Sequence, residues 1–576
     1  MLGLRRNRGT RTAADAADAA TVATSDAGRL SDGSLDSEVA KMAAEMGVDA
    51  SYERKVALLN KAIKDEIGFG KFQLWVTFLA GGGWAIDNFW FQALGMGLPQ
   101  IELEFEPEHI QFAALALYSG LLVGATVWGI LSDIIGRKVS WNVTLLLSGI
   151  LGVAVGGAPN FVGLGGLLGA LGVGVGGQLP IDGVMLIEFL PASHYWILTF
   201  LSVFWCLGQL FAAVMGWAFI TNFRCETADA CPKSSNMGWR YTWFVLGGVT
   251  LVMWAARFFI YPIPESPKFL IANGRDEEAL EVLRFIAKEN GKTTTLTLAQ
   301  LKAAGEGATY ANKQGDEEAA RGLDATPDEK TDAKLEAEVQ LEQVDKVESS
   351  SPLQRADRVN LQQLRRSLSQ FDTSHIRALF SSPKMAWNTS LICFLWGLIG
   401  LAYPLYNVFV ALYLKNAGAA SGGSSQAEQY RDLVIIAACG IPGSFFAAAM
   451  VELPYAGRKG TMALFTLLTG VFLFLFTTAR TPQAILGWNC ATSLSQNAMY
   501  SVLYAMSYEV FPAPHRGTGD GLAMATQRVF GVAAPVVGAF AGDKPDKPIY
   551  ISASFFIAAA ALMLFLPYET RGRAAL

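Results

Sequence analysis

The chain has 576 residues, of which 52% are hydrophobic and only 16% are charged, and its formal net charge is −5. A soluble domain of average composition carries about a quarter charged residues, so this composition argues against a soluble globular protein. Charged residues gather in residues 1–70 and around 290–380, and the rest falls into apolar blocks of twenty-odd residues. Because each block can cross about 30 Å of hydrocarbon, we predict an all-α, multi-pass membrane protein that sits in the lipid bilayer and binds no nucleic acid.

Residues 1–66 are predicted to form a cytoplasmic N-terminal tail. Its first 50 residues are rich in Ala, Asp, Ser and Gly and poor in large apolar side chains, which predicts disorder. The end of the tail shows apolar residues at helical spacing, which predicts an amphipathic helix at the membrane surface. These residues are Val56, Leu59, Ile63 and Ile67.

Twelve apolar blocks follow and divide into two groups of six. We predict an N-terminal six-helix bundle over 67–263, a cytoplasmic insert of amphipathic helices and long polar sequence over 264–380, a C-terminal six-helix bundle over 381–567 and a tail over 568–576. The blocks lie near residues 72–97, 110–131, 139–158, 161–187, 197–222, 241–262, 385–414, 432–451, 461–479, 483–507, 517–541 and 549–567.

A repeat supports the division into two halves. The string "GRK" occurs at 136–138 and 457–459, and "EFLPASH" at 188–194 returns as "EVFPAPH" at 509–515. Both pairs are separated by the same 321 residues. Two motifs that are displaced equally indicate duplicated halves, as in carriers built from two parallel six-helix repeats.

Basic residues concentrate in alternate loops, at Arg137 and Lys138, at Arg458 and Lys459, and at Arg516. The positive-inside rule then places both termini and the insert in the cytoplasm, and we predict the plasma membrane as the location. The opposite loops, 101–109 and 223–238, are poor in Lys and Arg. The second contains Cys225 and Cys231, which can form a disulfide if that loop faces an oxidising exterior.

A charge inside an apolar block costs about 3 kcal/mol and usually has a function, and we single out three such residues. Asp87 lies near the middle of the first block, Asp182 near the end of the fourth and Arg528 in the eleventh. Asp87 could carry a proton, bind a cationic substrate, pair with Arg528 or make a helix-packing hydrogen bond. Asp182 could share the coupling and binding roles, or it could cap a helix break beside Pro180 and Gly183. Arg528 could bind a substrate carboxylate or neutralise an acid.

Neutral polar and aromatic side chains of the same blocks are candidates for substrate binding, although each one singly could serve only to join helices. As a set they suit a small polar organic solute. They are Trp84, Gln178, Gln209, Tyr403, Tyr406, Asn407, Gln496, Asn497 and Tyr500.

The string "GVGVGG" at 172–177 matches a dinucleotide-binding pattern, but no predicted strand precedes it. A glycine stripe instead indicates close helix packing at Gly165, Gly169, Gly172 and Gly176. No cofactor or metal site is predicted, and no catalytic constellation or ATP-binding loop is seen in the sequence. These observations predict a gradient-driven process rather than an enzyme.

The string "GILSDIIGRK" at 129–138 follows the pattern G-x-x-x-D-x-x-G-R-K. It resembles the signature loop of the major facilitator superfamily, whose matching positions are Gly129, Asp133, Gly136, Arg137 and Lys138. The second copy departs from the pattern because Pro454 stands where the acid should be, and Glu452 could take over its role.

Other strings resemble members of the same superfamily. "PESPKFL" at 264–270 and "PYETRG" at 567–572 are similar to sugar-porter motifs, and "GFGKFQ" at 68–73 with "WAIDNF" at 84–89 resembles the branch related to synaptic-vesicle glycoproteins. The resemblance implies two rocking bundles around a central cavity lined by the first, fourth, seventh and tenth spans. It also implies a cytoplasmic gating network that joins the signature loop to Glu188, Glu265, Glu452, Arg458, Glu509 and Arg516.

We therefore predict a monomeric secondary transporter for a small polar organic solute, either an organic anion or a sugar-like molecule, with protons coupled through Asp87. Sugar specificity does not carry over, because the seventh block lacks the paired glutamines of sugar porters. Two alternatives stay open, a facilitative uniporter without protons and a non-transporting sensor or vesicle protein on the same fold.

Overall fold

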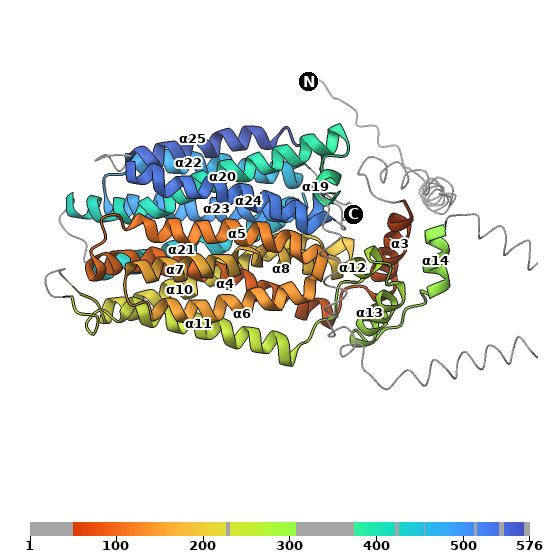
Figure 1. Ribbon diagram of the computed structural model, residues 1–576. Coiled ribbons are helices and arrows are strands. Elements are labelled where there is room, and N and C mark those ends of the chain that lie inside the picture. The colour runs from red at the N-terminus through yellow and green to blue at the C-terminus, as the bar shows by residue number, and fades with distance from the viewer. Residues whose placement is uncertain are drawn as a thin grey trace, which may run out of the picture.

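The computed structural model describes residues 50–225, 231–306, 374–420, 426–453, 455–511, 515–540 and 546–569. Every regular element in these ranges is a helix, and most of the helices are long and run side by side in one bundle (Figure 1). One end of the bundle carries Arg137 and Arg458 and is called the basic end. The other carries Cys225 and Cys231 and is called the disulfide end.

The first half of the bundle contains six membrane-length elements, three of which are interrupted. Gly70 precedes the first helix, and Asn160 caps the fourth by accepting a hydrogen bond from the Gly163 amide at 2.7 Å. The elements are α4 (Lys71–Phe105), α5 (Gln111–Ile135), α6 (Arg137–Gly156), α7 (Phe161–Gly176) with α8 (Gln178–Phe189), α9 (Trp196–Phe200) with α10 (Ser202–Asn222), and α11 (Gly238–Ala255) with the π-helix η4 (Ala256–Ile260).

The described part of the second half contains six helices, none of which is divided into separate elements. Its fourth helix begins with Pro482 after Thr481, whose hydroxyl accepts a hydrogen bond from the Ala484 amide. The helices are α20 (Pro383–Ala420), α21 (Gln426–Val451), α22 (Gly457–Thr478), α23 (Pro482–Val510), α24 (Arg516–Phe540) and α25 (Asp546–Met563).

The long helices differ in mean hydropathy, because some of them carry charged residues. In the described part of the chain, eight helices are long and apolar enough to cross a membrane. Helices α4, α23 and α24 have 35, 29 and 25 residues and are also long enough, but they include residues such as Asp87, Glu509 and Arg528. The predicted boundary of the first span was wrong, because α4 continues through 101–105, where Glu104 is held by Trp239 and Arg240.

A small cluster of helices covers the basic end (Figure 1). It contains α3 (Ala50–Lys61), the π-helix η1 (Ala62–Ile67), α12 (Pro267–Ala272), α13 (Asp276–Glu289) and α14 (Leu298–Glu306), and the short α19 (Ser374–Ala378) precedes α20. The amphipathic helix before the first span exists, but its apolar face is buried against protein and not against a membrane surface. Leu59 and Ile67 are fully buried, and Lys55 pairs with Asp276 at 2.6 Å.

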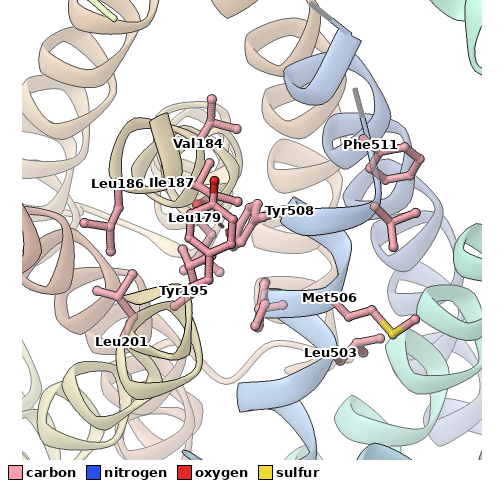
Figure 2. Close-up of a cluster of buried hydrophobic side chains, with 14 of the residues drawn as sticks. Leu179, Val184, Leu186, Ile187, Tyr195, Leu201, Leu503, Met506, Tyr508 and Phe511 are labelled. Carbon is pink, nitrogen blue, oxygen red and sulfur yellow. Dashed lines mark hydrogen bonds between the residues drawn. The ribbon is translucent and has the colours of Figure 1, made fainter. Parts of the chain in front are cut away.

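Close contact between helices depends on glycine at a few positions. A Cβ atom on Gly172 or Gly176 would lie 2.4–2.5 Å from backbone oxygens of α5, so these residues allow α5 and α7 to touch. Near the basic end, apolar side chains of α8 and α23 pack together where the halves meet (Figure 2). There the Tyr508 hydroxyl donates to the Leu179 carbonyl at 2.9 Å.

Candidate functional site

A small cavity lies in the middle of the bundle, between the two halves. Its lining comes from α4, α5, α10, α20, α23 and α24 and consists of Asp87, Phe91, Tyr118, Trp205, Tyr403, Tyr500, Tyr504, Gln527 and Arg528. It offers about 20 Å³ to the centres of water molecules, which is enough for one or two of them. The structure therefore holds the cavity in a nearly closed form.

Asp87 and Arg528 both face this cavity, and no direct ion pair joins them in the described part of the chain. Asp87 Oδ2 accepts a weak hydrogen bond from Trp205 Nε1 at 3.4 Å, and Asp87 Oδ1 and Arg528 Nε have no partner among the described residues. The Arg528 guanidinium lies 5.5 Å from the ring centre of Phe91. Both charged groups thus keep bonding capacity for a ligand.

Aromatic rings form most of the cavity wall. The ring centres of Trp205 and Tyr403 each lie 5.4 Å from that of Tyr500, and the stacked Tyr504 ring lies 6.0 Å from Tyr500. Rings at these separations offer both faces and edges to a flat ligand. The site thus combines one carboxyl group, one guanidinium cation and a largely aromatic surface.

A charge cluster at the basic end, called the N-latch, consists of Asp133, Arg137, Glu188 and Glu265. Arg137 pairs with Asp133 at 3.1 Å and with Glu188 at 3.3 Å. Asp133 also reaches the other half, where its Oδ2 accepts from the Thr518 amide at 2.7 Å and from the Thr518 hydroxyl at 2.8 Å. The N-latch therefore holds α5 against α24.

Close approach at this contact requires glycine on both helices. A Cβ atom on Gly129 would lie 2.7 Å from the Gly521 Cα atom. Gly136 has a φ of +106°, a conformation that side chains rarely adopt, and a Cβ there would meet Glu265. The structure thus requires these two glycines of the signature loop for different reasons, Gly129 for the helix contact and Gly136 for its backbone conformation.

Glu265 binds the start of α6 from the loop before α12. Its carboxylate accepts from the backbone amides of Arg137 at 3.1 Å and Lys138 at 3.2 Å. Burial raises the pKa of Glu265, an effect that its hydrogen bond from Ser266 and the charge of Arg137 oppose. Nearby, burial lowers the pKa of Lys268 to about 7.

The second half contains a related cluster, called the C-latch, made of Glu452, Arg458, Glu509 and Glu569. Arg458 forms a two-pronged pair with Glu509 at 2.7 and 2.8 Å. Glu569 accepts from the backbone amides of Arg458 at 3.0 Å and Lys459 at 3.3 Å, as Glu265 does in the first half. Glu452 lies 3.8 Å from Arg458 with a side chain that is 55% exposed, and Pro454 lies outside the described residues.

Comparison with known proteins places the chain in a family. A profile described as "Sugar (and other) transporter" matches residues 108–319. Over 530 residues the chain is 43% identical to MFS siderochrome iron transporter 1 of Ceriporiopsis subvermispora, covering 92% of this chain and 93% of that protein. This chain belongs to the major facilitator superfamily. It is therefore a secondary transporter and not an enzyme, and the superfamily prediction is confirmed.

Further similarities agree with this assignment. The major facilitator-type transporter hxnZ of Emericella nidulans is 35% identical, covering 94% of this chain and 91% of that protein. The synaptic vesicle 2-related protein of Bos taurus is 25% identical, covering 88% and 80%. The proton:xylose symporter XylE bound to 6-bromo-6-deoxy-D-glucose superposes with a TM-score of 0.61 at 15% identity, covering 88% of this chain and 98% of that one, which confirms the all-helical fold.

Asp182 of the transporter does not line the described cavity. It is fully buried within the first half, where it pairs with Arg257 at 3.0 Å and accepts a hydrogen bond from Trp141 Nε1. A Cβ atom on Gly83 would collide with its Oδ2, so α4 and α8 touch here. Arg257 was not predicted from the sequence, and this pairing favours a structural role over proton coupling or substrate binding.

Of the other residues that were predicted to bind substrate, some line or adjoin the cavity and the rest lie away from it. Tyr403 and Tyr500 line the cavity, and Trp84 packs edge-on against Tyr504 at 4.9 Å. The Tyr406 hydroxyl donates to Asn489 instead. Away from the described lining lie Gln178, Gln209, Tyr406, Asn407, Gln496 and Asn497.

Five lining residues of the transporter were not predicted from the sequence. They are Phe91, Tyr118, Trp205, Tyr504 and Gln527. Helical spacing could have identified two of them, because Phe91 follows Asp87 by four residues and Tyr504 follows Tyr500 by four. Tyr118 lies on α5, from which no binding residue was predicted, whereas Trp205 lies on α10, four residues before the predicted Gln209.

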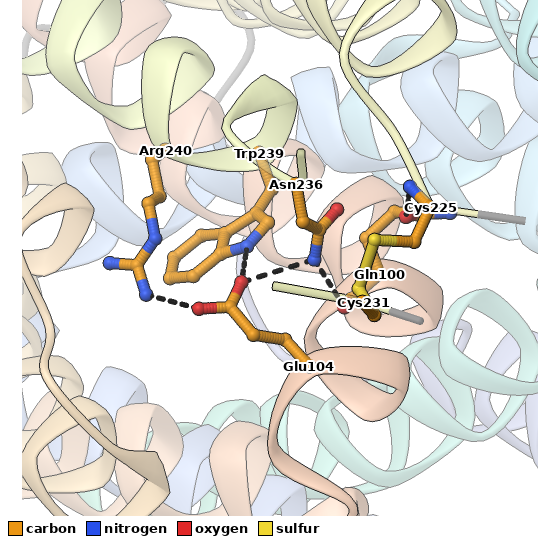
Figure 3. The surroundings of a disulfide bond; sticks show 7 residues. All are labelled: Gln100, Glu104, Cys225, Cys231, Asn236, Trp239 and Arg240. Carbon is orange, nitrogen blue, oxygen red and sulfur yellow. Dashed lines mark hydrogen bonds and ion pairs between the residues drawn. A yellow bond between two sulfur atoms is a disulfide. The ribbon is translucent and has the colours of Figure 1, made fainter. Parts of the chain in front are cut away.

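At the disulfide end, a separate network holds the first half together (Figure 3). Cys225 and Cys231 form a disulfide, and the Cys225 amide donates to Gln100 of α4 at 3.1 Å. Glu104 pairs with Arg240 at 2.5 Å and accepts from Trp239 at 2.9 Å. This network fastens α4 to α11 and to the disulfide loop.

Proposed function

We propose that this transporter carries a small organic anion with a flat, unsaturated or aromatic group, together with a proton. The single observation behind this proposal is that Asp87 and Arg528 line one cavity whose remaining wall is aromatic apart from Gln527. This combination offers a different contact to the charged group of the substrate, to its flat part and to the proton.

Recognition would begin at Arg528. Its planar guanidinium can donate two parallel hydrogen bonds to a carboxylate, and Gln527 beside it can donate another. Trp205, Tyr403 and Tyr500 would then sandwich the flat part of the ion. A polar sugar would find few hydrogen-bonding groups on this wall, which is why we favour an aromatic acid over a sugar.

Charge balance supplies the reason for proton coupling. Without substrate, the charges of Asp87 and Arg528 cancel, and an added anion leaves one excess negative charge in a nearly closed space with a largely aromatic wall. A proton on Asp87 restores neutrality. Substrate binding and proton binding then strengthen each other, which is the thermodynamic requirement of symport.

Contacts at both ends of the cavity suit alternating access. The N-latch joins the halves at the basic end, and at the disulfide end the Tyr430 hydroxyl donates to the Met96 carbonyl at 3.2 Å. Rocking of the halves would break one set of contacts at a time. From the loop charges we infer that the basic end and both termini face the cytoplasm.

An iron chelate is a second candidate substrate. It is favoured by the 43% identity to a protein named as a siderochrome iron transporter. The present cavity would have to expand greatly for such a cargo. The suggested kinship with synaptic-vesicle-related proteins stays a prediction and indicates no substrate.

A thermal-shift assay on the purified full chain tests the recognition step. We expect benzoate or nicotinate to raise the melting temperature and the uncharged benzamide or nicotinamide to leave it unchanged, because a ligand that binds only the folded state stabilises it. Arg528→Gln should abolish the shift, and Gln209→Ala, outside the described lining, should retain it. Equal shifts by acid and amide, or a shift by a ferric hydroxamate alone, would contradict the proposal.

Transport in proteoliposomes tests the coupling step with the same acids. Asp87→Asn should lose accumulation driven by a pH gradient by about tenfold or more and keep acid-for-acid exchange, because it can no longer take up the proton that balances the anion. Full accumulation by Asp87→Asn would contradict coupling through Asp87, and flux without accumulation in the wild-type protein would indicate a uniporter. Binding without any flux in the wild-type protein would indicate the sensor.

A further inference from the structure

Among the described residues, one buried acid outside the cavity and the latches has no hydrogen-bond partner on either carboxylate oxygen. Asp520 lies in α24, four residues after Arg516 and eight before Arg528, which is about 6 and 12 Å along the helix axis. It is fully buried, and neither carboxylate oxygen has a hydrogen-bond partner among the described residues. Asp520 therefore lies between the N-latch and the cavity without a described structural role.

The groups around Asp520 link it to the cavity on one side and to the N-latch on the other. Tyr504, which lines the cavity, lies within electrostatic range of both Asp87 and Asp520. Tyr508 of α23 and Cys393 of α20 also lie within range. On its own helix the charged neighbour is Arg516. The other helices that contact α24 contribute six charged groups whose side chains the structure describes, namely Asp133, Asp182, Glu188, Glu509, Lys384 and Arg377. Asp133 is engaged with Thr518, Asp182 with Arg257, Glu188 with Arg516 and Glu509 with Arg458. Lys384 lies over the Tyr568 ring, and Arg377 is exposed.

A bare carboxylate in a dry protein interior is strongly unfavourable, and a protonated carboxyl is far less so. Arg516 does not remove this cost in the closed structure, because it is engaged with Glu188 at 3.9 Å and with the Phe511 carbonyl at 3.2 Å. We propose that Asp520 is a second proton-binding site, filled while the basic end is closed and emptied when the N-latch opens. This inference rests on the proton coupling proposed above.

Opening of the basic end explains why Asp520 would release its proton. Glu188 belongs to the first half and Arg516 to the second, so separation of the halves breaks their pair. Arg516 and Asp520 are four residues apart on one helix and can then pair with each other. The Asp520 O–H bond breaks, its proton passes to water at the basic end, and the carboxylate is held by Arg516.

Infrared spectroscopy of the full chain in lipid nanodiscs tests the site without a substrate. At pH 7 we expect a C=O stretching band of a protonated carboxyl in the wild-type protein. This band should be lost in Asp520→Asn and retained at a shifted position in Asp520→Glu. It should be unchanged in the control Asp432→Asn, which alters an acid at the other end of the bundle.

A second variant tests the link to the N-latch. Glu188→Gln removes the acidic partner that Arg516 has in the first half, which should shift the Arg516 charge toward the Asp520 carboxylate. The Asp520 band in this background is obtained by subtracting the spectrum of the double variant Glu188→Gln/Asp520→Asn from that of Glu188→Gln. We expect it to fall to about half or less of its wild-type size, because a nearby cation favours the ionised form.

Two results would overturn the proposal. One is a wild-type spectrum that Asp520→Asn leaves unchanged, and the other is an Asp520 band of full size in the Glu188→Gln background. The Asp520→Glu variant keeps the test valid if Asp520→Asn does not fold. If the band behaves as expected but the wild-type protein moves no protons with benzoate, the proposed coupling through Asp87 fails and the Asp520 site stands.

Discussion

The two latches of this duplicated chain share two kinds of contact and differ in a third. In each half, a glutamate from the end of the bundle accepts hydrogen bonds from the amides of the Arg-Lys pair, namely Glu265 in the first and Glu569 in the second. In each half, the arginine also pairs with the glutamate that ends the fourth span. This shared part holds each half together.

The difference lies at the acid of the signature loop. Asp133 bridges Arg137 and Thr518 and thus joins the two halves, whereas Glu452 of the C-latch is 3.8 Å from Arg458 and more than half exposed. A buried pair responds strongly to the loss of one partner, and an exposed pair responds weakly. We infer that the N-latch sets the balance between open and closed states, and that the C-latch mainly stabilises its own half.

The largest effect is expected for Arg137→Ala compared with Arg458→Ala. Loss of Arg137 leaves Asp133 and Glu188 buried without their main charge partner, at a cost of about 3–5 kcal/mol. Chemical denaturation would measure the cost, and hydrogen exchange of residues 516–522 would rise only in Arg137→Ala. Equal exchange in both variants would contradict the assignment of separate roles.

A smaller change, Thr518→Val, removes one of the two bonds that cross to Asp133. The hydroxyl bond is lost and the amide bond remains, so we expect a cost of about 1.5–3 kcal/mol to the closed state. Faster hydrogen exchange at the basic end would report it. Thr526→Val on the same helix removes a bond to the Leu522 carbonyl and a contact with Cys393 of the same half, but no bond between the halves, and should have no such effect.

The buried Lys268, which lies near the N-latch, is expected to make the stability of the protein depend on pH. An unfolded lysine keeps its proton up to about pH 10.5, whereas the buried Lys268 loses it above about pH 7. Between these values the unfolded state binds more protons, so stability should rise with pH. Lys268→Met should therefore raise stability by about 1–3 kcal/mol near pH 7 and by much less near pH 10. A gain in melting temperature that does not depend on pH would contradict this expectation.

The smallest effect is expected for Glu452→Ala. Its pair with Arg458 is long and exposed, so the free energy of unfolding should change by less than about 0.5 kcal/mol. Glu509→Ala, which removes the short buried partner of Arg458, serves as the matched comparison and should cost several times more. Similar costs for the two variants would mean that Glu452 has the role of the signature acid.

Much of the fold could be predicted because it depends on local composition and repeated strings. Apolar block length predicted the membrane helices, and the paired strings around Arg137 and Arg458 predicted the duplicated halves. The signature loop predicted which residues gather at the basic end. Helix ends were less predictable, since α4 extends to Phe105 through side-chain contacts with distant Trp239 and Arg240.

The candidate site was only partly predictable, because the sequence shows that a charge is buried without showing what it faces. Asp87, Asp182 and Asp520 are all acids in apolar helices, yet one lines a cavity, one pairs with Arg257 and one has no described partner. Composition and repeated strings by themselves predicted a duplicated all-helical membrane protein, and the signature loop predicted the transporter superfamily that it resembles. Only the tertiary structure decided which acids meet which partners, because those contacts join helices that are far apart along the chain.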